Sequence, residues 1–268
     1  MLCILARVRK ICDRADETRV PASRALFLGG VRIRDNGGDI AVPRRALFFT
    51  RFMLLLATIA FAFALPSSVS AAPATHMLAG MPPTGQLWNL SCEYAATSAA
   101  TAYFGNRVTQ QTLRDEIDTD YNPHKGFRGN IAAPWGGTTN YGIYAEPIAA
   151  VLQQHGFGNS YVFYGDADTL RAELMLDHPV VVWVTGDFSV QWRITVQDDD
   201  STFALIPREH AVTVYGYDET GVWVMDPSDV TQYHVGWSLF DRAWAQFDRM
   251  ALAVAPTKLP THTSRNEY

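Results

Sequence analysis

Two kinds of hydrophobic pattern follow one another along the chain. The first half holds Ala-rich or amphipathic segments that end at Gly or Pro, which predicts helices over residues 92–104, 110–117, 145–155 and 167–176. The second half consists of short β-rich runs separated by Gly, Pro and Asp: PVVVWVTG, RITVQ, STFALIP, HAVTVYGYD, GVWVMDP and ALAVAP. Helices first and an antiparallel sheet second predict an α+β domain.

Polar residues at the starts of these segments indicate where the helices begin. Asn89 or Ser91 is placed to cap the first helix, and Thr109 the second. Another helix is expected after Ser238, where Ser238 and Asp241 resemble a capping box.

Between Asp118 and Tyr144 the chain is crowded with Gly, Pro and Asn. This composition predicts a long loop, and its aromatic residues favour an ordered one.

The N-terminal third has the three-part plan of a signal peptide. Arg44, Arg45 and Arg51 precede the apolar run 52–65, and small residues follow up to Ala71. The run is short for a membrane span, so cleavage near Ala72 is expected, with an uncleaved anchor as the alternative and as the one route to membrane contact. The predicted organisation is an N-terminal extension of uncertain status (1–43), a signal peptide (44–71), a linker or extended arm (72–84), one folded domain (85–256) and a C-terminal tail (257–268).

Charge narrows the classes of partner. Beyond Ala71 the chain carries 11 basic and 22 acidic side chains, a net charge of about −11. Such a surface repels nucleic acid and anionic lipid. No nucleic-acid partner is therefore expected. The signal-peptide pattern predicts export to the cell envelope or medium, and we also expect no cofactor and a monomeric state.

Cys92 is the only cysteine beyond the predicted signal peptide, and it stands at the start of the first predicted helix. A helix N-terminus favours a thiolate, so the position suits a nucleophile. The alternative is that Cys92 is a small buried hydrophobic residue, as most free cysteines are.

His210 and Asp226 favour the catalytic interpretation. HAVTVYGY and GVWVMD read as two strands of a hairpin with a turn around 218–221, which would bring His210 and Asp226 to the same end of the sheet. His210 would then be a general base and Asp226 its orienting partner. The structural alternative is a strand start and an Asp-Pro turn. Gln86, six residues before Cys92, is a candidate oxyanion-hole donor.

Other residues receive lesser roles. Phe127, Trp135 and Trp192 are candidates for the rim of a substrate cleft, although core packing is the default for aromatic residues. Glu93 is interpreted as a first-turn acid or as a hydrogen-bond partner for nearby loops. No metal site is predicted, because zinc-type patterns such as HEXXH and paired CXXC are missing. The acidic run 198–200 is interpreted as a solvated turn rather than a calcium loop.

Taken together, the strings QLWNLSCEYAA, NPHKGFRGN, GIYAEPIAAVLQQHG, HPVVVWV and HAVTVYGYDETGVWVMDP resemble a known family. They are similar to the bacteriocin-processing, double-glycine-leader type of papain-like cysteine peptidase, the thirty-ninth family of such enzymes, in its secreted single-domain branch. The resemblance spans roughly 85–229. One departure is Ser91, where many relatives have Gly or Asp.

The resemblance implies a papain-like fold, with the nucleophile helix packed on an antiparallel sheet, and hydrolysis of a peptide or related amide bond. By position it makes Cys92 the nucleophile, His210 the base, Asp226 its partner and Gln86 part of the oxyanion hole. A peptide or a peptidoglycan stem is the expected substrate. The alternatives are a catalytically inactive binding module and an acyl or peptidyl transferase.

Overall fold

The computed structural model describes residues 73–134, 136–199 and 201–258. Its helices are α2 (Cys92–Tyr103), α3 (Gln110–Glu116), α4 (Ala145–Gln154), α5 (Ala167–Met175) and α6 (Trp237–Ala245). Its strands are β1 (His76–Met77), β2 (Tyr161–Tyr164), β3 (Val180–Thr185), β4 (Ile194–Gln197), β5 (Thr202–Leu205), β6 (Glu209–Tyr217), β7 (Gly221–Asp226), β8 (Thr231–Gly236) and β9 (Met250–Ala253). Among the described helices, none has the length and apolar character that a bilayer span requires.

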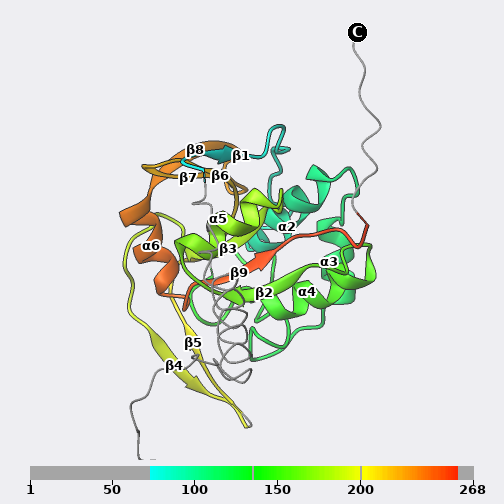
Figure 1. Cartoon of the computed structure of the whole chain (residues 1–268). Coiled ribbons are helices and arrows are strands. Elements are labelled where there is room, and N and C mark those ends of the chain that lie inside the picture. Colours follow the sequence, from blue (N-terminus) through cyan, green and yellow to red (C-terminus); the bar gives the residue numbers. More distant parts are fainter. Residues whose placement is uncertain (1–72, 135, 200, 259–268) are drawn as a thin grey trace, which may run out of the picture. The chain divides into compact units, whose positions relative to one another are not determined.

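The centre of the fold is an antiparallel sheet. Its strands lie in the order β2-β9-β3-β6-β7-β8, and β1 pairs with β6 outside this path. β4 and β5 form a separate hairpin, which extends toward the bottom of the view in Figure 1. Helices first and sheet second is the predicted α+β order.

The sheet buries both of its faces. Because side chains alternate along a strand, Val181 and Trp183 of β3 pack with the core around α2, α3 and α4. Val180, Val182 and Val184 pack with the core around α5 and α6. All five are completely buried, which explains why this strand reads as one continuous apolar run rather than as an alternating one.

Helix α2 begins at Cys92, as predicted, and most of its residues are buried. Ser91 occupies the N-cap position, but its hydroxyl does not cap the helix and donates instead to Trp88 O and Gln110 Oε1. Thr109 does cap α3, since its hydroxyl accepts from the N–H of Thr112.

The capping-box prediction before α6 is wrong. The helix starts at Trp237 with Gly236 in the cap position, so Ser238 and Asp241 both lie inside it. Strand β8 ends directly at Gly236 and leaves no loop in which Ser238 could serve as a cap. Strands β1, β2 and β8 were not predicted: they are short or carry exposed polar positions, which weakens the strand pattern.

The segment 73–84 is an extended arm packed on the sheet. His76 pairs with Tyr217 and Met77 with Gly216, at the end of β6. Leu78 and Met81 are buried, and Gln232 of β8 donates to Met81 O. Of the two predicted forms, linker or arm, the structure has the arm.

Several predictions fall outside the described residues. These are the extension 1–43, the signal peptide 44–71 and the part of the tail beyond Lys258. The predicted rim residue Trp135 also falls outside.

Candidate active site

A hydrogen-bonded turn positions the start of α2. The side chain of Gln110 reaches from α3 into residues 85–91: its Nε2 donates to Gly85 O at 2.8 Å, and its Oε1 accepts from Leu87 N and from Ser91 Oγ, both at 3.0 Å. Gln110 is itself buried. This buried amide fixes the backbone just before Cys92, a role that the sequence pattern did not reveal.

The β6–β7 hairpin brings His210 and Asp226 together. The turn closes between Asp218 and Gly221, as expected, and His210 Nε2 lies 2.8 Å from Asp226 Oδ1. Both side chains are at least nine-tenths buried. Asp226 also accepts hydrogen bonds from Ser228, and its Oδ2 accepts from the hydroxyl of Tyr233 at 2.8 Å. The carboxylate is therefore held by several donors.

These donors decide the charge state of Asp226. Burial alone would raise the pKa of its carboxyl, but the hydrogen bonds from His210 and Ser228 outweigh that effect and hold the pKa below its usual value. Asp226 is therefore a carboxylate that can fix the orientation of the His210 ring, with Nδ1 left as the ring nitrogen available to another group.

Cys92 lies beside strand β6, which carries His210, but its thiol bonds other residues. Its thiol donates to Glu93 Oε2 at 3.3 Å and accepts the backbone N–H of Ala211, the residue directly after His210. Between the described side chains of Cys92 and His210 the structure has no hydrogen bond. Because side chains alternate along β6, Glu209 and His210 project to opposite sides of the strand, and Glu209 is the one that approaches the thiol.

Glu93 is a buried part of the site rather than a surface acid. Its Oε1 accepts the backbone N–H of Ile143 at 2.7 Å, so it anchors the end of the long loop to α2. Gly142 makes this possible: it has a φ of +140°, and a Cβ there would lie 2.1 Å from Glu93 Oε1 and 2.8 Å from Glu209 Oε2. The interpretation of Glu93 as a partner for nearby loops agrees with this geometry.

Glu209 completes an unexpected cluster. The thiol sulfur of Cys92 and one carboxyl oxygen each of Glu93 and Glu209 all lie within 4.8 Å of one another. Part of Glu209 reaches the surface, yet its Oε1 is buried and has no hydrogen-bond partner. Burial, reinforced by the nearby Glu93 charge, raises the pKa of Glu209 well above its usual value. Burial also raises the pKa of Glu93, to about 7.

The surroundings of Cys92 change the pKa of its thiol. Burial first, and then the neighbouring carboxyl groups of Glu93 and Glu209, raise the pKa of Cys92 well above its usual value. The expectation that a helix N-terminus favours the thiolate is therefore not met in this structure. Cys92 is 6% exposed and lies between two carboxyl groups. Both conditions destabilise the thiolate by more than the helix dipole and one backbone N–H stabilise it.

Gln86 lies at the same end of the domain, but its amide is already engaged. Its Nε2 donates to Trp88 O at 3.1 Å and to Asn89 O at 3.0 Å. Its backbone N–H donates to Pro227 O, next to Asp226. The side chain therefore stabilises the turn before α2, and its N–H groups would have to leave these carbonyls to bind an oxyanion.

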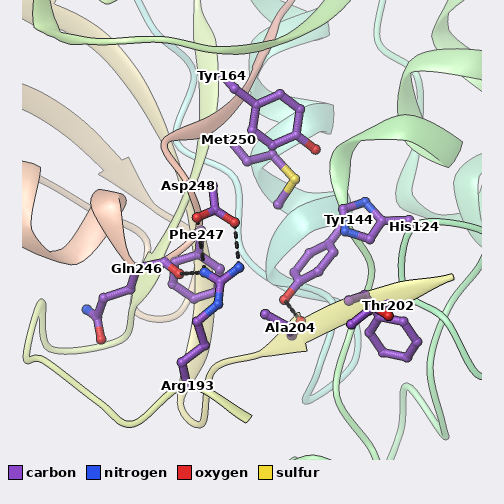
Figure 2. Close-up of a pocket in the computed structure, with 11 residues that line it drawn as sticks. His124, Tyr144, Tyr164, Arg193, Thr202, Ala204, Gln246, Phe247, Asp248 and Met250 are labelled. Atoms are coloured by element: carbon purple, nitrogen blue, oxygen red, sulfur yellow. Dashed lines mark hydrogen bonds and ion pairs between the residues drawn. The ribbon is translucent and has the colours of Figure 1, made fainter. Parts of the chain in front are cut away.

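The predicted rim residues have different environments. Phe127 is buried and lines a cavity of about 340 Å³ together with Tyr94 of α2 and the loop residues Gly129 and Ile131. Trp192 is 65% exposed and lines neither this cavity nor the one in Figure 2.

A second cavity, of about 170 Å³, lies between the β4–β5 hairpin and the strand end at Met250 (Figure 2). Its polar groups are paired with each other or with nearby groups. Arg193 forms two hydrogen bonds with Asp248, and the hydroxyl of Tyr144 donates to Ala204 O. His124, on the wall of this cavity, bonds Glu146. Neither cavity is lined by Cys92 or His210.

Each of the other histidines that the structure describes contacts one carboxylate. His76 contacts Asp177, His155 contacts Glu116, His178 contacts Glu173 and His234 contacts Asp218. In the acidic run, Asp198 forms an ion pair with Lys125. These contacts give the groups structural roles.

Comparison with known proteins shows the family of the chain. The model of the peptidase C39-like family matches residues 79–252, which include both helix α2 and the His210–Asp226 hairpin. The chain belongs to the peptidase C39-like family. A relative in Bacillus subtilis, the uncharacterized protein YvpB, is 26% identical over 196 residues, which cover 69% of this chain and 76% of YvpB.

Solved structures give the fold. A crystal structure of a Bacillus anthracis protein proposed to be a C39-like peptidase superposes with a TM-score of 0.60 at 22% identity, and covers 68% of this chain and 97% of that protein. Xylellain, a cysteine protease from Xylella fastidiosa, gives a TM-score of 0.39 at 14% identity over 72% of this chain and 90% of xylellain, too low to establish a shared fold by itself. The predicted α+β architecture, with helix α2 packed on an antiparallel sheet, is confirmed, and this C39-like chain shares its fold with the Bacillus anthracis protein.

Proposed function

We propose that this C39-like protein is an exported cysteine hydrolase that cleaves a peptide or related amide bond. The observation that carries the proposal is the buried His210–Asp226 pair at 2.8 Å, on the strand whose Ala211 N–H contacts the Cys92 thiol. A nucleophile, a base and an orienting carboxylate are thus supplied by one helix and one hairpin.

The proposed reaction requires Nδ1 of His210 to come within hydrogen-bond distance of the Cys92 thiol. Cys92 Sγ then attacks the carbonyl carbon of the substrate as the thiol proton passes to His210. The tetrahedral intermediate collapses, His210 returns that proton to the leaving amine, and a thioester on Cys92 remains. Water, activated by His210, then releases the acid product and restores the thiol. Asp226 orients the ring throughout through its bond to Nε2.

Stabilisation of the oxyanion is assigned to the backbone N–H of Cys92 and, after release from Trp88 O and Asn89 O, to the amide of Gln86. One such donor is typically worth about 2.7–4 kcal/mol of barrier. The substrate class is a peptide or a peptidoglycan stem, in keeping with an exported, acidic, monomeric protein that does not bind nucleic acid.

The direct test is Cys92→Ala. Wild type and variant, both starting at Ala72, are incubated with a peptide library and with purified peptidoglycan, and new termini are detected by mass spectrometry. Hydrolysis by the wild type and its loss in the variant, with unchanged circular dichroism, is the expected result. Full hydrolysis by Cys92→Ala would refute the assignment.

One observation favours a second candidate function. The thiol of Cys92 is bonded to Glu93 rather than to His210, and neither of the two cavities described above is lined by Cys92. A catalytically inactive module that holds the same class of ligand would have this geometry. Retention of peptide or peptidoglycan by the wild type, without any cleavage, would support that candidate.

A further inference from the structure

Two carboxyl groups, those of Glu93 and Glu209, lie beside the Cys92 thiol and have no part in the reaction proposed for Cys92, His210 and Asp226. Glu93 Oε2 accepts the Cys92 thiol at 3.3 Å, and Glu209 has an oxygen within 4.8 Å of both. Two carboxyl groups this close in a buried site do not ionise independently, because like charges repel strongly where water is excluded.

The hydrogen bonds show which of the two holds the charge. The Glu93 carboxylate receives the Ile143 N–H at 2.7 Å, its own backbone N–H and the thiol. The Oε1 atom of Glu209 receives no donor and is buried. Since donors stabilise a carboxylate and an unpartnered buried oxygen does not, Glu93 is the group that ionises and Glu209 the one that keeps its proton.

We propose that Glu93 and Glu209 are positioning residues that keep the Cys92 thiol protonated in the resting site, with Glu93 carrying the charge and Glu209 the proton. This inference rests on Cys92 being the nucleophile of the proposed function. It adds a second titrating unit to the site, beside the His210–Asp226 pair, and that unit sets the pH range in which the thiol can react.

The charge of Glu93 determines whether the Cys92 thiolate is repelled or stabilised. When Glu93 is ionised, a thiolate beside it is repelled and the thiol proton is held by Oε2. When Glu93 is neutral, the repulsion is gone and its O–H can donate to a thiolate. The pKa of Glu93, about 7, puts this change near neutrality. The other titratable groups acting on the pair are His210 and Tyr94 on Glu93, and Tyr141 and Tyr144 near Glu209.

A consequence concerns the survival of a lone exported thiol. Oxidants and disulfides react with the thiolate form, so a thiol kept neutral and 6% exposed reacts slowly. The same carboxyl pair that lowers the resting reactivity of Cys92 would therefore protect it in an oxidising compartment.

The test measures the rate of Cys92 alkylation by iodoacetamide against pH, by intact mass, and does not depend on hydrolysis. In the wild type the midpoint should lie above about 8.5, the usual thiol value. Glu93→Gln keeps an oxygen for the Ile143 N–H but removes the charge. It should move the midpoint down by at least one pH unit and speed alkylation at pH 7.5 about tenfold or more.

Glu209→Gln is the matched control, because it makes the same chemical change on a group that is already neutral. It should leave the midpoint within about half a pH unit of the wild type, or raise it, since Glu93 then ionises more readily. Equal downward shifts in both variants would overturn the assignment of charge and proton.

A wild-type midpoint at or below 8.5 overturns the proposal without any variant, which covers the case in which Glu93→Gln does not fold. The two proposals also fail separately. Hydrolysis retained by Cys92→Ala removes the proposed function and leaves the alkylation result standing. An unchanged midpoint in folded Glu93→Gln removes the carboxyl-pair proposal alone.

Discussion

Two groups of carboxylates lie on either side of the same strand end, and their environments are opposite. Asp226 receives hydrogen bonds from His210, Ser228 and Tyr233, and its pKa is lowered despite burial. Glu93 and Glu209 are buried together, and their pKa values are raised. Burial therefore does not decide the charge of an acid by itself, because the number of hydrogen-bond donors and the charge of the neighbouring group also act on its pKa.

The two groups also have different roles. On the hairpin side, which holds His210 and Asp226, a negative charge orients an imidazole. On the helix side, which holds Cys92, Glu93 and Glu209, protons are kept close to a thiol. One strand, β6, serves both, since His210 and Glu209 are consecutive residues that project to opposite sides.

The largest expected effect comes from removing the permanent charge. Asp226→Ala leaves His210, Ser228 and Tyr233 without their shared acceptor in a buried site, and should lower the free energy of unfolding by about 3–5 kcal/mol. Urea denaturation measures it. Asp168→Ala removes an exposed acid paired with Arg171 and should change stability by less than about 1 kcal/mol. Similar losses in both variants would contradict the role given to the Asp226 network.

The second effect is a pH dependence of opposite sign on the two sides. The folded pKa of Glu93 is raised from 4.5 to about 7, so its contribution to stability is complete below about pH 4.5 and is lost as pH rises through 7. The loss is on the order of 3 kcal/mol. The folded pKa of Asp226 is lowered, so its contribution is present above about pH 4 and is lost as pH falls further.

Glu93→Gln separates these two contributions. Between pH 5 and 8 its free energy of unfolding should decline less steeply than that of the wild type, because only the raised pKa of Glu209 then contributes. Below pH 4 both proteins should lose stability together. Denaturation curves at a series of pH values measure this. A decline between pH 5 and 8 as steep as that of the wild type would show that Glu93 is not the titrating group.

The smallest of the three effects concerns the space between the carboxyl groups. Gly142→Ala places a Cβ against both Glu93 and Glu209 at a positive φ, and should cost about 2 kcal/mol or more. Gly137→Ala lies in the same loop, also at positive φ, with nothing within 4 Å, and should cost about 1 kcal/mol. The thermal midpoints of the two variants are compared. Equal losses would mean that backbone strain alone, and not the close approach, makes Gly142 necessary.

Much of the hairpin side could be predicted from sequence because its information is local. The two β-rich runs, the turn at 218–221 and the spacing of His210 and Asp226 place both residues at the same end of the hairpin, where they meet. The start of α2 at Cys92 was predicted for the same reason, since helix patterns depend on neighbouring residues.

The helix side was only partly predictable because its contacts are distant in sequence. From the sequence alone, Glu209 next to His210 would be taken for a surface acid. Only the packing of α2 on β6 brings it close to Cys92. The closure of the long loop by Ile143 on Glu93 is equally non-local. Without these contacts, the helix dipole alone predicted a thiolate, whereas the assembled site favours the thiol.

The N-terminal arm has a consequence for the order in which this chain is completed. His76 and Met77 pair with the last residues of β6, and nearly all of the described chain before β7 lies between these partners. During synthesis from the N-terminus, the arm emerges long before its partner strand β6. Pairing across such a separation is slow, so closure of β1 on β6 is expected among the last events of folding.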